Sequence, residues 1–200
     1  MKKLLDALIL VAGAAAFAVS FKMIVQFVGI RSPWVALMGM FTFLGLVTFA
    51  RPFYLLKMPG GLRKVRKWEL DGRLYQKSGV HVFGEILRRT PLRYLQPLVY
   101  LKRSPGDPTA VRNQLEGAEA AHFWAGLLII PYMVYACVQN WWSIVFWFMV
   151  VQLVGHVYPI MNLRWVRGRL EQVLERKRTK TASLSKSVGD AEMDKQQSNA

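Results

Sequence analysis

The side chains best placed to do chemistry lie just before a long apolar run. Glu116, Glu119 and His122 are spaced three residues apart, so on a helix they project from one side. From Phe123 to Val138 the chain carries no charge, which places this polar side where a membrane begins. Because a carboxylate and an imidazole at or inside a bilayer are costly, such groups are by default functional. Complementation of a helix dipole would account for Glu116, but poorly for His122.

A histidine in this setting suits acid–base chemistry, because its unperturbed pKa lies near neutrality. Transfer of an acyl group to a hydroxyl needs a base near that hydroxyl, and His122 fits the role. Glu119 is placed to orient the imidazole, as the third group of a catalytic triad does. Negative charge that develops on the substrate needs hydrogen-bond donors, which Arg73, Arg164 and Arg167 can supply.

A metal centre is the competing chemistry for a Glu-x-x-His pair. Di-iron carboxylate bundles need two such motifs and two further glutamates, whereas this chain has one motif and three histidines in all. A mononuclear site of Glu119, His122 and either His81 or His156 stays open, although we predict no bound metal. Otherwise His81 is expected on the surface, and His156 is equally suited to bond a neighbouring helix or to join the site.

The elements that must position these residues are membrane helices. The chain is 53% hydrophobic and 20% charged, with the charge segregated rather than interspersed. We expect an all-α integral membrane protein with four transmembrane helices in two hairpins and a cytoplasmic basic amphipathic loop. One membrane-embedded domain should cover residues 1–170, followed by a basic and then disordered cytoplasmic tail over residues 171–200. The expected spans are about 7–30, 34–50, 119–138 and 141–161, with an interfacial loop over residues 51–118.

Charge sets the expected orientation and partners. The basic start before an apolar stretch resembles a signal peptide, but the apolar character resumes beyond Lys22, so we expect an uncleaved anchor. The net charge of +15 flanks apolar segments and comes with no nucleic-acid-binding signature, so no nucleic-acid partner is expected. The positive-inside rule predicts a multi-pass protein of the inner (cytoplasmic) membrane with both termini cytoplasmic. The basic stretch Arg63–Lys67 is expected to contact anionic lipid head groups or a phosphorylated substrate.

Three polar clusters then share the predicted cytoplasmic side, and their order resembles a known family. The first is Trp68-Glu69-x-x-Gly72-x-x-Tyr75, the second is Glu119-x-x-His122, and the third is the Arg164–Leu170 stretch that follows Pro159. These clusters resemble the small membrane acyltransferases of the glycosyl-4,4'-diaponeurosporenoate type, which esterify the sugar of a glycosylated carotenoid acid. The resemblance covers roughly residues 34–170, and it departs from the family pattern at Leu163, Trp165 and Val166.

The resemblance implies transfer of a fatty acyl group from acyl-coenzyme A or acyl carrier protein to a hydroxyl of a glycosylated lipid, such as a carotenoid glycoside. It implies no bound cofactor, with His122 and Glu119 catalytic. The implied substrate-binding residues are Trp68, Glu69, Arg73, Tyr75, Arg164, Arg167 and Arg169. As alternatives, the arginines serve as topology anchors and the aromatic residues as interfacial packing. Two other function classes also stay open: a non-catalytic membrane assembly factor, and a small membrane methyltransferase.

Overall fold

The computed structural model describes residues 2–54, 57–91, 108–176 and 179, and these ranges are all-helical, with no strand. The long helices are α1 (Lys2–Val28), α2 (Pro33–Tyr54), α7 (Pro108–Val138) and α8 (Trp142–Gln152). Beyond Gln152, α8 passes through a π-helical turn, η3 (Leu153–Val157), and then continues as a helix to Arg176. Among the described residues between α2 and α7 are the short helices α3 (Gly60–Arg63), α4 (Lys67–Leu70), α5 (Arg73–Lys77) and α6 (Val80–Arg89).

Four of these helices are long and apolar enough to cross a membrane, which confirms an all-α chain with four segments of transmembrane length. They are Leu4–Val28, Pro33–Ala50, Pro108–Val138 and Trp142–Arg176. The last two have 31 and 35 residues, whereas a bilayer core needs about 20. The helices therefore continue past the limits that hydropathy predicts, and their polar ends carry the charged motifs. The predicted loop residues 92–107 and the tail residues 180–200 lie outside the described residues.

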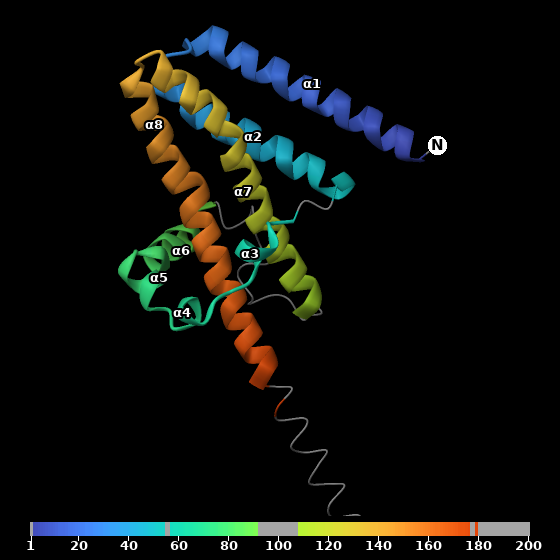
Figure 1. Cartoon of the computed structure of the whole chain (residues 1–200), viewed down its shortest axis with the longest axis vertical. Helices are drawn as coiled ribbons and strands as arrows, with labels where there is room; N and C mark the ends of the chain where they lie inside the picture. The colour runs from blue at the N-terminus through green and yellow to red at the C-terminus, as the bar shows by residue number, and fades with distance from the viewer. Residues whose placement is uncertain (1, 55–56, 92–107, 177–178, 180–200) are drawn as a thin grey trace, which may run out of the picture.

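The long helices pack around α2. It contacts both α7 and α8, while α1 packs against α2 on the outside of the group (Figure 1). The main apolar cluster joins three helices and consists of Val35, Ala36, Ile129, Ala136, Ile144 and Phe148. Small residues in this cluster let the backbones of α2, α7 and α8 approach closely.

The two short connections, α1–α2 and α7–α8, lie at the same end of the helices (Figure 1). The guanidinium of Arg31 stacks over the Trp141 ring, 4.9 Å from its centroid. The Tyr132 hydroxyl donates to the carbonyl of Ile30 at 2.9 Å. Asn140 has φ 57°, a left-handed conformation that asparagine tolerates better than most residues and that closes the tight turn. These contacts hold the two connections together.

The short helices α3–α6 lie beside the distal half of α8, away from these connections (Figure 1). The amphipathic helix α6 is fastened there by Tyr158, whose ring lies 5.4 Å from that of Phe83 and whose hydroxyl donates to the carbonyl of Ser78 at 3.0 Å. On its outer side, α6 leaves Val82 and Ile86 exposed. This apolar face suits a helix that rests on a membrane surface.

Candidate functional site

An arginine–carboxylate pair is buried between α7 and the distal part of α8. Glu119 and Arg167 are each 1% exposed, and two parallel hydrogen bonds join them, Nε to Oε1 at 2.8 Å and Nη2 to Oε2 at 2.9 Å. Nη1 reaches Glu116 at 3.2 Å, and Nη2 also donates to the carbonyl of Arg63 at 2.7 Å. Bidentate, charge-assisted bonds of this kind are the strongest that these side chains form.

A second pair of the same design ties α4 to α8. The Arg164 guanidinium donates to Glu69 through Nε at 2.9 Å and Nη2 at 2.8 Å. It also donates to the carbonyls of Leu62 and Lys64. Glu69 further accepts hydrogen bonds from the Tyr75 hydroxyl at 3.3 Å and from the backbone N–H of Arg66 at 2.6 Å. The basic segment before α4 is therefore held on α8 through its backbone carbonyls and through Glu69.

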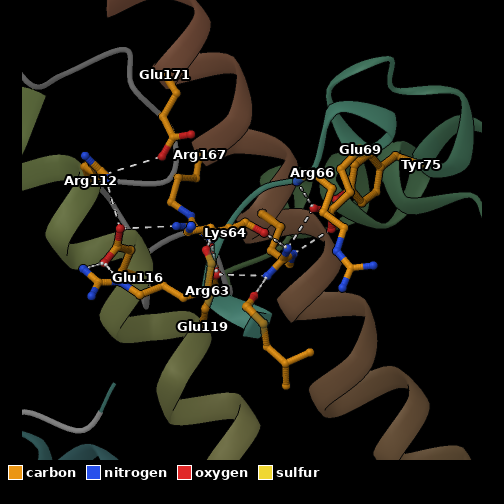
Figure 2. A network of polar contacts seen from close by, with 12 residues as sticks. Arg63, Lys64, Arg66, Glu69, Tyr75, Arg112, Glu116, Glu119, Arg167 and Glu171 are labelled. Carbon is orange, nitrogen blue, oxygen red and sulfur yellow. Dashed lines mark hydrogen bonds and ion pairs between the residues drawn. The ribbon is translucent and has the colours of Figure 1, made fainter. Parts of the chain in front are cut away.

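The two pairs belong to one arginine–glutamate network in which the charges balance (Figure 2). Arg164 connects the halves, since its Nη1 lies 4.0 Å from Glu119 Oε2. Mutual pairing makes burial of these ions beside an apolar core tolerable, because an unpaired buried charge is costly. The members are Arg63, Arg112, Arg164 and Arg167 with Glu69, Glu116, Glu119 and Glu171.

His122 lies on α7 just beyond this network and faces the π-helical turn. Its side chain is buried, and Nδ1 lies 3.0 Å from the carbonyl oxygen of Gly155. Because a carbonyl can only accept a hydrogen bond, Nδ1 must carry the proton. In the neutral ring, Nε2 then holds the free lone pair, which is the nitrogen that a general base uses. The backbone thus fixes the tautomer of the predicted base.

The predicted orientation of His122 by Glu119 is wrong in this geometry. The i, i+3 spacing puts the two side chains on one side of α7, as expected, but the Glu119 carboxylate turns to Arg167. A guanidinium supplies two charged donors in a planar fork, which the neutral imidazole cannot match. Gly155 takes the orienting role, and nothing local to the Glu-x-x-His motif indicates it.

His156, which the sequence left undecided, lies next to His122. The ring centroids are 5.8 Å apart and the rings meet edge-on. His156 is 2% exposed, and neither ring nitrogen makes a hydrogen bond of ordinary geometry in the part of the chain that the structure describes. It belongs to the π-helical turn and packs against Gly126 of α7. Single π turns within α-helices are frequent at functional sites.

The predicted substrate-binding residues divide into two groups. Glu69, Tyr75, Arg164 and Arg167 belong to the buried network, so the guanidiniums expected to meet substrate are occupied by carboxylates and carbonyls. Arg73 and Arg169 are exposed instead.

Arg169 stacks 4.3 Å above the Trp165 ring, and that ring lies 6.5 Å from Tyr75. Burial, together with the charge of Glu69, raises the pKa of Tyr75 to about 12, so the phenol stays protonated at neutral pH. The side chain of Trp68 lies outside the described part of the chain.

Of the residues weighed as metal ligands, His122 and His156 are neighbours, but no third ligand joins them within the described part of the chain. No group of three or more histidine, cysteine or acidic side chains suited to a metal is found among the described residues. His81 is exposed on α6, and Glu119 is engaged by Arg167.

The segment that carries these side chains also matches a protein-family model. The model for glycosyl-4,4'-diaponeurosporenoate acyltransferase matches residues 61–176, more than half of the chain. The chain belongs to this acyltransferase family. The match confirms the resemblance that the three motifs predicted, and it includes both arginine–glutamate pairs and both buried histidines. Searches of curated proteins and of solved structures return no match.

Replacement of Glu119 by alanine should be strongly destabilising, because it removes the bidentate partner of the buried Arg167 and leaves only the longer ion pair with Glu116. Breaking such a pair costs about 3–5 kcal/mol, which thermal unfolding of the detergent-solubilised protein would measure. Arg112→Ala is the matched control: it removes a more exposed partner of the same network, where a loss of about 0–1 kcal/mol is expected. Equal unfolding temperatures for Glu119→Ala and the wild type would contradict a structural pair.

Glu69 should make stability depend on acid pH. Burial raises the pKa of Glu69, but the hydrogen bonds from Arg164 and the Arg66 backbone and the charge of Arg164 outweigh it, so the pKa falls below its usual 4.5. A lowered folded-state pKa stabilises the protein above pH 4.5, and this contribution is lost as the pH falls through the lowered value. Unfolding temperatures measured from pH 7 to pH 3 should fall less steeply in Glu69→Gln than in wild type. Parallel curves would show that Glu69 does not contribute to this pH dependence.

Proposed function

We propose that this protein is an integral membrane O-acyltransferase. It moves a fatty acyl group from a thioester donor, acyl-coenzyme A or acyl carrier protein, to a hydroxyl of a glycosylated lipid acceptor. One observation carries the proposal: within the segment that matches the acyltransferase family, the buried His122 has Nδ1 fixed on Gly155 and Nε2 left as a base. The family's description supports a carotenoid glycoside as the model acceptor.

The base removes the proton from the acceptor hydroxyl while the hydroxyl oxygen attacks the thioester carbonyl carbon. His122 Nε2 receives that proton and later gives it to the departing thiolate, so that an ester and a free thiol result. The location supports this chemistry, since His122 lies between the polar network and the apolar core of the helices. A lipid acceptor and a water-soluble donor can meet at such a boundary.

The arginine–glutamate network acts in this proposal as a positioning device. Glu119 with Arg167 and Glu69 with Arg164 clamp the basic segment onto α7 and α8. The same contacts fix α8 against α7, and with it the carbonyl of Gly155 opposite His122. We therefore move Glu119 from a catalytic to a positioning role.

The exposed cations are left to bind phosphates. Arg169 stacks on the Trp165 ring, and Gly72, which precedes Arg73 in the sequence, lies near the indole nitrogen of Trp165. We assign Arg73 and Arg169 to the phosphates of the acyl donor. Lys64 and Arg66, which are exposed on the basic segment, suit anionic lipid head groups, and that attraction falls with salt.

We further propose that the four long helices cross the membrane as two hairpins, with the segment between them and both termini in the cytoplasm. The contacts between the α1–α2 and α7–α8 connections support this arrangement, because they put both short turns on one side. The cations of the short helices gather at the other end, as the positive-inside rule requires of the cytoplasmic side.

Loss of the base should lower turnover without unfolding the protein. His122→Ala is expected to reduce acyl transfer by about 10²–10⁴-fold, the usual contribution of a general base. The assay follows a labelled acyl group from acyl-coenzyme A or acyl carrier protein to a glycosylated carotenoid acid, with purified protein in lipid nanodiscs. His81→Ala, on the exposed side of α6, is the matched control and should keep wild-type turnover.

Two results would overturn the assignment. Wild-type turnover in His122→Ala would show that His122 is not the base. A wild-type protein that transfers a labelled methyl group but no acyl group would favour the methyltransferase alternative.

The topology can be tested with single cysteines in a Cys137→Ala background. A membrane-impermeant thiol reagent added to intact cells should label a cysteine at Asn140, in the α7–α8 turn, but not one at Lys77, at the end of α5. Labelling at Lys77 and protection at Asn140 would invert the proposed orientation.

A further inference from the structure

His156 is a buried polar side chain that the proposed mechanism leaves without a role. It is 2% exposed, yet neither ring nitrogen makes an ordinary hydrogen bond within the described residues. A buried donor or acceptor left unsatisfied loses its hydration and gains no bond in exchange, which destabilises the folded protein. The ring therefore weakens the resting protein, and an apolar side chain of similar size would fill the position at lower cost. Unsatisfied buried groups in native structures call for a functional explanation.

The surroundings of His156 indicate what the missing partner is. The ring meets His122 edge-on, with centroids 5.8 Å apart, and three other residues of the π-helical turn, Leu153, Val154 and Val157, are apolar and exposed. In a membrane these side chains face lipid, which suits a long acyl chain. The partner should thus be a polar atom at the end of an apolar group, next to the base.

The reaction itself needs a donor at this place. When a hydroxyl attacks a thioester, negative charge develops on the carbonyl oxygen, and donors fixed beside that oxygen stabilise it. The guanidiniums first expected to act there, those of Arg164 and Arg167, are consumed by carboxylates and carbonyls. The ring of His156 meets that of His122, and its nitrogens make no hydrogen bond of ordinary geometry within the described residues, so its N–H can turn to this oxygen.

We propose that His156 is a second catalytic residue, whose ring N–H donates a hydrogen bond to the acyl carbonyl oxygen as that oxygen becomes an oxyanion. The inference rests on the proposed function. As the acceptor oxygen bonds to the thioester carbon, the carbonyl π pair moves to oxygen, where His156 meets it, and the hydroxyl proton goes to His122. Collapse of the intermediate restores the carbonyl, breaks the carbon–sulfur bond and returns the proton to the thiolate. The neutral imidazole of His156 is unchanged at the end.

Two substitutions at this position separate catalysis from packing. His156→Leu introduces an apolar side chain of similar size and removes the donor, so turnover should fall by about 10²–10³-fold, the effect of losing one oxyanion donor. The KM for the acyl donor should change little, because the lost bond forms in the transition state. The unfolding temperature should be equal to or above that of wild type, since an unsatisfied buried group has been removed. His156→Gln retains an N–H donor and should recover part of the lost turnover.

His81→Leu, on the exposed surface of α6, is the matched control and should be unchanged in turnover. Wild-type turnover in His156→Leu, with His122→Ala inactive, would overturn this inference and leave the proposed function intact. A lowered unfolding temperature in His156→Leu with no recovery in His156→Gln would make the residue structural and also overturn it. A wild type that transfers no acyl group would overturn the proposed function, and this inference with it.

Discussion

The structure depends on the requirement that a guanidinium buried beside an apolar core be completely paired. Arg167 is 1% exposed, and its nitrogens are satisfied only when α7 supplies Glu119 and Glu116 and the chain before α4 supplies the carbonyl of Arg63. Three segments far apart in sequence must therefore come together at once. Such networks contribute little net stability compared with apolar packing, but they penalise every arrangement in which one partner is missing. Specificity of assembly, rather than strength, is what the network supplies.

This constraint also separates the charged motifs from the histidines that we propose to be catalytic. Arg164, Arg167 and the glutamates that bind them use their hydrogen-bonding capacity on each other. The two histidines remain with nitrogens to spare, next to the network but not within it. A histidine in contact with these charges would have its protonation state set by them. Separation leaves Nε2 of His122 outside the ion pairs, while the network holds the helices that carry the ring.

Much of the fold was accessible from the sequence, because hydropathy and helix length are local properties. The four apolar segments and the gathering of Glu69, Tyr75, Glu119, Arg164 and Arg167 on one side of the protein follow from motif spacing and charge. Which glutamate pairs with which arginine does not follow from the sequence, because bidentate geometry selects the pairs and depends on the folded structure. The carbonyl that orients His122 belongs to Gly155 in a π turn, for which the sequence has no clear signal. Hydropathy also made the last two helices too short, α7 at its start and α8 at its end, because charges paired with one another allow a helix to continue where an isolated charge would mark its end.

The π-helical turn also decides which way the side chains of α8 point around the helix axis. A π turn inserts one extra residue into a helix, and each residue of an α-helix advances about 100° around the axis. The turn at Leu153–Val157 thus rotates everything beyond it relative to everything before it. On the near side, Ile144 and Phe148 face the apolar cluster, and on the far side Arg164 and Arg167 face the glutamates. A regular helix with one residue fewer would keep the first alignment and turn the second away from its partners. The extra residue thus lets α8 turn its apolar side to the core before the π turn and its arginines to the glutamates after it. The π turn that makes this possible also contains His156 and the carbonyl of Gly155.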